Sequence, residues 1–136
     1  MTKAKAATLS QVSLAGYWLL LVVATHVPAT MPFLPGRRVD KLYHAAAFAL
    51  LAVLLATAWT FTLGRVTGRV LGGIVFSLAL YGVVDELTQP LFGRACSIYD
   101  WLADIAGAAV GVVLFVWLRG KFETRCRPET ASGIEG

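Results

Sequence analysis

Residues 41–63 read KLYHAAAFALLAVLLATAWTFTL, and from Ala45 onward this stretch contains no charged residue. A helix rises about 1.5 Å per residue, so roughly 20 apolar residues cross the hydrocarbon core of a bilayer. The polarity of the stretch does not alternate, as that of a strand in a membrane barrel would. The stretch therefore predicts a transmembrane helix.

Three further apolar runs surround this one. The chain has 57% hydrophobic and only 15% charged residues, whereas soluble domains carry about 25% charged residues. Backbone polar groups must find partners within lipid, and helices supply those partners internally. We therefore expect an all-α integral membrane bundle of four transmembrane helices. The spans are expected at residues 12–27, 41–63, 70–89 and 100–118.

These spans divide the chain into a polar tail (1–10), a membrane domain (11–118) and a second polar tail (119–136). The second tail is expected to be partly disordered, because it is polar and contains Pro, Ser and Gly. Asp40 stands where the N-cap of the second span is expected. The first run is the shortest, so a cleaved signal peptide is an alternative interpretation, although no clear A-x-A cleavage site follows it.

Lysine and arginine residues predict the orientation of the bundle. Four spans place both termini on one side, and the side richer in Lys and Arg is the cytoplasmic one. The tails and the turn between the second and third spans carry Lys3, Lys5, Arg65, Arg69, Arg119, Lys121, Arg125 and Arg127. The opposite side carries Arg37, Arg38, Lys41 and Arg94. We therefore expect both termini in the cytoplasm, with the protein in the cytoplasmic (inner) membrane.

The predicted topology also bears on the net charge and on the two cysteines. The formal net charge of +4 comes from basic residues that flank the spans, so no nucleic-acid partner is predicted. Cys96 and Cys126 are the two cysteines, and they fall on opposite sides of the membrane. They form neither a disulfide framework nor a metal motif.

Ionisable residues gather at one membrane face, the outer one in this orientation. Such residues are costly within a span, about 2.5–3.5 kcal/mol each on insertion scales, and they normally face the bundle interior. Residues three or four apart share a helix face, so three helix ends are expected to converge on one polar pocket. The members are Asp40, Lys41, His44, Asp85, Glu86, Gln89, Arg94, Ser97, Asp100 and Asp104, with His26 nearby.

These residue types suit a site for an anionic lipid headgroup. Glu86, Asp104 and His44 are the candidate catalytic residues, since buried carboxyls and imidazole serve in general acid–base chemistry. Lys41 and Arg94 are expected to hold an anionic group. The remaining candidate binding residues are Gln89, Asp40 and Asp100. Imidazole and carboxylate also suit a divalent metal, but the spacing matches no HExxH-type motif, so no metal site is predicted. The sequence does not identify a cofactor.

Two other interpretations remain open. The same residues can form an interhelical network that only stabilises the bundle, in which case function lies in partner binding. The protein can also be a small transporter or channel subunit. Such a protein would need ionisable residues along its path across the membrane, and the cytoplasmic half of each span is nearly free of them. Small residues at intervals of four, Ala103, Gly107 and Gly111, favour close helix packing within the bundle over dimerisation.

An ordered set of short motifs over residues 40–111 resembles the VanZ-like family of small bacterial membrane proteins. The matching pieces are Asp40-Lys41-x-x-His44 with Phe48, Glu86-x-x-Gln89, Gly93-Arg94, Ser97, Asp100, and Asp104-x-x-Gly107 with Gly111. The chain departs from the family pattern at Asp104, where Asn is usual, and at Phe92-Gly93, where Pro-Gly is common.

The resemblance implies a membrane protein of the bacterial cell envelope but no particular reaction. The founding member of the family is linked to low-level resistance to the glycopeptide teicoplanin, which acts at the envelope. An envelope lipid or its headgroup is therefore the expected partner, together with the surrounding membrane lipids.

Overall fold

The computed structural model of the chain describes residues 2–26 and 37–125, and this part is helical with short connections. Four helices in it are long and apolar enough to cross a membrane, which confirms the predicted all-α bundle. They are α1 (Lys3–Thr25), α2 (Arg37–Leu63), α3 (Gly68–Thr88) and α4 (Ile98–Arg125), with a short 3₁₀ helix, η1 (Gln89–Phe92), after α3. Residues 27–36 and 126–136, which include Cys126 and most of the tail predicted to be partly disordered, lie outside the described residues.

Helix α1 begins at Lys3, well before residue 12, where the apolar run that predicted this helix starts. Thr2 is its N-cap and accepts a hydrogen bond from the backbone N–H of Lys5. The hydroxyls of Thr8 and Ser10 donate to helix carbonyls one turn earlier, so these polar residues are accommodated within the helix. Hydropathy marks only the apolar part of a helix, which explains why the polar first turns were expected to form a tail.

Helix α2 begins at Arg37, so Asp40 lies in its first turn. The expectation that Asp40 caps this helix was wrong. A carboxylate in the first turn is still favourable there, because the unpaired N–H groups give the helix N-terminus a partial positive charge.

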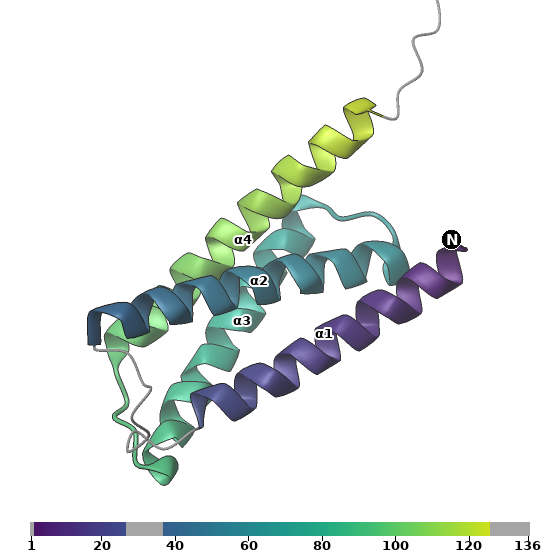
Figure 1. Ribbon diagram of the computed structural model, residues 1–136. Coiled ribbons are helices and arrows are strands. Elements are labelled where there is room, and N and C mark those ends of the chain that lie inside the picture. Colours follow the sequence, from purple (N-terminus) through teal and green to yellow (C-terminus); the bar gives the residue numbers. More distant parts are fainter. Residues whose placement is uncertain (1, 27–36, 126–136) are drawn as a thin grey trace, which may run out of the picture.

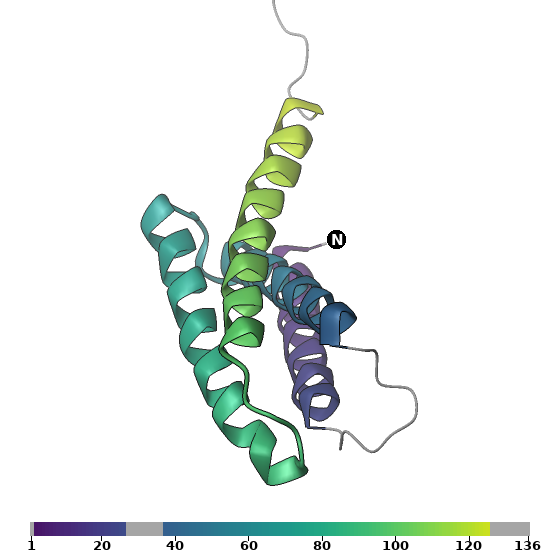
Figure 2. The same ribbon diagram turned by 90° about the vertical axis from the view of Figure 1, so that its left-hand side faces the viewer.

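The most extensive packing joins α2 to α4 (Figures 1 and 2). A Cβ atom at Gly107 would overlap the backbone of Ala45, and one at Gly111 would overlap the backbone of Ala49. These two glycines therefore allow the two helix backbones to touch. The prediction that the small residues serve packing within the bundle is confirmed.

Helix α1 packs mainly on α2, and α3 packs mainly on α4. Because successive helices run in opposite directions, α1 and α3 end where α2 and α4 begin, at the lower left of Figure 1. We call this the polar end of the bundle; it comprises residues 25–26, 37–44 and 85–104. The apolar core lies between it and the opposite end and includes Phe48, Leu51, Ala52, Ile74, Leu78 and Phe115.

Candidate functional site at the polar end

Two ion pairs lie at the rim of the polar end. The ammonium of Lys41 on α2 contacts Asp100 on α4 at 2.7 Å. The guanidinium of Arg94, in the connection after η1, contacts Asp40 on α2 at 3.3 Å. Gly93, with φ of 74°, turns the chain sharply after η1 and directs it back toward the rim. Both predicted anion-holding cations are thus already paired with carboxylates.

Below the rim lies an enclosed cluster of His44, Glu86 and Asp104, from α2, α3 and α4. Their residues are only 5%, 3% and 0% exposed. The Nδ1 atom of His44 lies 2.9 Å from Oδ1 of Asp104. Glu86 accepts a hydrogen bond of 2.7 Å from the backbone N–H of Ser97. We call these three residues the inner triad.

Gln89 links the inner triad to a further buried carboxylate, Asp85. Its side-chain amide donates to Asp85 at 3.0 Å and to Glu86 at 3.3 Å. Asp85 also accepts a hydrogen bond of 2.7 Å from the hydroxyl of Thr25 on α1. His26 lies beside them, with Nδ1 4.0 Å from Asp85.

The sequence placed Asp85 in the expected polar pocket but gave it no catalytic or binding role, and it did not indicate Thr25 at all. The adjacency of Asp85 to Glu86, with Gln89 one turn later, was the available signal for Asp85. Thr25 gave no signal, because its partner lies 60 residues away in the sequence.

A gap in the side chains of α3 faces Asp104. Gly82 presents no side chain there, and a Cβ atom at Gly82 would lie 3.1 Å from Oδ2 of Asp104 and 3.2 Å from the Trp101 ring. Among the described residues, this Oδ2 is one of two buried side-chain oxygens without a hydrogen-bond partner, the other being the hydroxyl of Tyr81. Asp104 therefore retains free acceptor capacity in an enclosed place.

A cavity of about 360 Å³ opens between α1 and α2 at the polar end. One part of its wall is apolar, with Leu20, Leu21, Ala24 and Ala47, and another carries Asp40, His44 and Arg94. Of the inner triad, only His44 lines this cavity. The wall of the cavity therefore has both an apolar part and a polar part.

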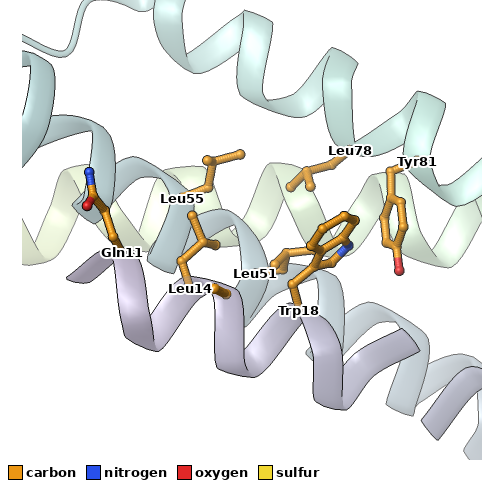
Figure 3. Close-up of a pocket in the computed structure, with 8 residues that line it drawn as sticks. Gln11, Leu14, Trp18, Leu51, Leu55, Leu78 and Tyr81 are labelled. Atoms are coloured by element: carbon orange, nitrogen blue, oxygen red, sulfur yellow. The ribbon is translucent and has the colours of Figure 1, made fainter. Parts of the chain in front are cut away.

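A second cavity, of about 340 Å³, lies deeper in the bundle (Figure 3). Leu14 and Trp18 of α1, Leu51 and Leu55 of α2, and Leu78 and Tyr81 of α3 line it, with Gln11 at one end. Its wall is almost entirely apolar. It suits hydrocarbon and offers little to a polar ligand.

All the candidate site residues predicted from the sequence lie at the polar end. Hydrogen bonds or ion pairs join each of them to another member or to Ser97, as described above. Within residues 2–26 and 37–125, two sets of three have candidate ligand atoms within 4.8 Å of one another: the inner triad, and Asp40, His44 and Asp100. The residues of this cluster come from three helices, so the packing of the bundle brings them together.

Comparison with known proteins identifies the family of this chain. No curated protein and no solved structure matches the chain. The model of the family described as VanZ/LLP1 matches residues 5–119. This range includes the whole polar end and all four long helices apart from residues 3–4 of α1 and 120–125 of α4. The chain is therefore a multi-pass membrane protein that belongs to the VanZ/LLP1 family.

Proposed function

We propose that the polar end binds an envelope lipid through its anionic headgroup, with the acyl chains in contact with α1 and α2. The observation that carries this proposal is the amphipathic cavity between these helices. Its apolar wall suits hydrocarbon, and its polar wall contains Arg94, the residue type that best recognises phosphate.

The pairing of the cations with carboxylates fits reversible binding. A phosphate can take over the guanidinium of Arg94 from Asp40, because Arg94 forms only one contact of 3.3 Å with that carboxylate. Lys41 is half exposed at the rim and can reorient toward a headgroup. His44, which lines the cavity, would then be placed to exchange a proton with the bound headgroup if the protein is an enzyme.

The distribution of basic residues supports an outer-leaflet site. With both termini in the cytoplasm, the polar end faces the outside of the inner membrane of a bacterium. The lipid would enter sideways from the outer leaflet. Most of the helix surfaces in the described part expose large apolar side chains suited to lipid contact.

Lipid retention tests the proposal. The protein is purified in mild detergent, and the lipids that remain bound are identified by native mass spectrometry. We expect an anionic lipid on the wild-type chain and at least about a tenfold lower occupancy in Arg94→Ala, as expected for losing about 1.4 kcal/mol or more of charge-assisted hydrogen bonding. Arg119→Ala is the matched control, because Arg119 forms a similar pair with Glu123 away from the polar end.

Equal lipid occupancy in both arginine variants and the wild type would contradict the proposal. The rival function is structural, and one observation favours it: the contacts of Lys41, Arg94 and Glu86 each connect different helices or loops. In that case Arg94→Ala lowers the yield of folded protein, while the protein that does fold retains lipid as the wild type does.

The resemblance to the family's founding member supplies a physiological readout for the proposed envelope role. If the site acts on an envelope lipid, expression of the chain should change teicoplanin susceptibility in a bacterium that lacks it. The Arg94→Ala variant should then lose this change.

A further inference from the structure

We propose that the inner triad, His44, Glu86 and Asp104, is a binding site for one divalent first-row metal ion, with Zn²⁺ as the best-suited ion. This inference goes beyond lipid binding and does not depend on it. Its basis is the convergence of one imidazole and two carboxylates from three helices, at a depth where a charge needs a partner.

The separations fit a single ion. The candidate ligand atoms of the three residues all lie within 4.8 Å of one another. Zinc binds nitrogen and oxygen at about 2.0–2.2 Å in tetrahedral geometry, so two ligands of one ion lie roughly 3.3–3.6 Å apart. Small side-chain adjustments therefore bring all three onto one ion, and the fourth position stays open for water or a ligand.

A free acceptor in the triad gives independent support. Asp104 is fully buried, yet its Oδ2 has no hydrogen-bond partner. This oxygen lies against α3 beside Gly82, one turn before Glu86 and on the same helix face. Leaving such an atom unpaired is costly in a dry interior, and a metal ion between α3 and α4 would satisfy it.

The charge of this region also calls for a cation. Asp85, Glu86 and Asp104 are all buried, and no Lys or Arg among the described side chains forms an ion pair with them. In the described ion pairs, Lys and Arg side chains contact Asp40, Asp100 and Glu123, and the basic side chains within ion-pair distance of Asp85 and Asp104 are the histidines His26 and His44. Carboxylates buried within a membrane protein normally have a partner or bind a metal.

The neighbours of Glu86 hold it as the neighbours of a metal ligand do. Ser97 donates a backbone N–H to one oxygen, and Gln89 donates its side-chain amide to the other. Such outer hydrogen bonds orient first-shell carboxylates and strengthen metal binding. Each carboxylate oxygen has two lone pairs, so an oxygen that accepts one hydrogen bond can still bind a metal.

The neighbouring set of Asp40, His44 and Asp100 is the weaker candidate, although its ligand atoms are equally close. Arg94 already neutralises Asp40, and Lys41 neutralises Asp100. A metal there would have to displace two cations. This difference makes Asp40→Asn a matched control for Asp104→Asn, since both remove one carboxylate from a set that contains His44.

The test is a titration of the full chain, purified in detergent and treated with a chelator, with Zn²⁺ in a calorimeter. We expect one Zn²⁺ per chain and a melting temperature that rises with Zn²⁺, because an ion that binds only the folded state stabilises it. Glu86→Gln and Asp104→Asn should each bind at least about tenfold more weakly, and Asp40→Asn should bind as the wild type does. Circular dichroism establishes that each variant is folded.

Absence of saturable binding by the wild-type chain overturns the proposal, whatever the variants do. Unchanged Zn²⁺ affinity in folded Glu86→Gln or Asp104→Asn also overturns it. Weakening in Asp40→Asn alone would place the ion in the neighbouring set and likewise contradict the proposal. None of these outcomes depends on lipid retention by Arg94→Ala, so the two proposals fail separately.

Discussion

At the scale of single residues, the polar end is unusual for the number of buried carboxyls that only neutral or weakly basic groups contact. Glu86 shows the arrangement most clearly, with one oxygen bonded to the N–H of Ser97 and the other to the amide of Gln89. A carboxylate is needed at this position, because without it the N–H of Ser97 and the amide of Gln89 would each lack an acceptor.

The first prediction concerns this hydrogen bonding. Glu86→Gln places an NH₂ group where one of two donors now finds an acceptor, so we expect a loss of about 1–3 kcal/mol in the free energy of unfolding. Glu123→Gln is the matched control. Its side chain is exposed and pairs only with Arg119, so its loss should stay below about 0.5 kcal/mol.

Unfolding of the detergent-solubilised protein by SDS, followed by circular dichroism, measures both changes. Equal effects of the two substitutions would show that Glu86 is not held by Ser97 and Gln89. The comparison is informative because the two substitutions are chemically identical and differ only in their surroundings.

Helical spacing predicted which side chains of one helix share a face, but it does not show which side chains of different helices meet. Glu86 and Gln89 are three apart, so their shared face follows from the helix repeat alone. The contact of His44 with Asp104 spans 60 residues and was expected only as a meeting of helix ends. The bonding of Asp85 to Thr25 was not expected, since a threonine in an apolar helix carries no signature of its partner.

At the scale of helices, the close approach of α2 and α4 positions the polar end. Gly107 and Gly111 lie against the backbone of α2, and the same two helices carry His44 and Asp104. Close backbone packing therefore fixes the distance across which these two side chains meet.

The second prediction concerns this packing. Gly111→Val would force atoms into the backbone of Ala49, so we expect a destabilisation of about 1–3 kcal/mol or more from overpacking. Gly72→Val in α3 is the matched control, because a side chain at Gly72 meets nothing within 4 Å. The folded fraction after heating in detergent compares them, and equal loss in both variants would contradict the α2–α4 contact.

Hydropathy predicted the four long helices, but it did not predict the residues at which they begin and end. Lys3 and Lys5 begin α1 although they are charged, since lysine is a good helix former and Thr2 caps the first turn. Helix α4 likewise continues past Leu118 to Arg125, and the pair of Arg119 and Glu123, one turn apart, supports this extension.

At the scale of the whole molecule, the described part has two chemically different ends. The polar end contains the buried carboxyls, whereas the opposite end exposes Arg65, in the turn between α2 and α3, and Arg69, in the first turn of α3. The proposed lipid site requires that the polar end face the outside of the cell, as the excess of Lys and Arg at the opposite end predicts.

Cys96 provides the most direct test of this placement, since it is exposed in the loop at the polar end. In a Cys126→Ser chain, a membrane-impermeant thiol reagent added to intact cells should label Cys96. A matched reporter, Thr124→Cys with both native cysteines replaced by Ser, should label only after the cells are opened, because Thr124 is exposed near the end of α4. Labelling of the Thr124→Cys chain in intact cells, with Cys96 protected, would place the polar end in the cytoplasm and contradict an outer-leaflet lipid site.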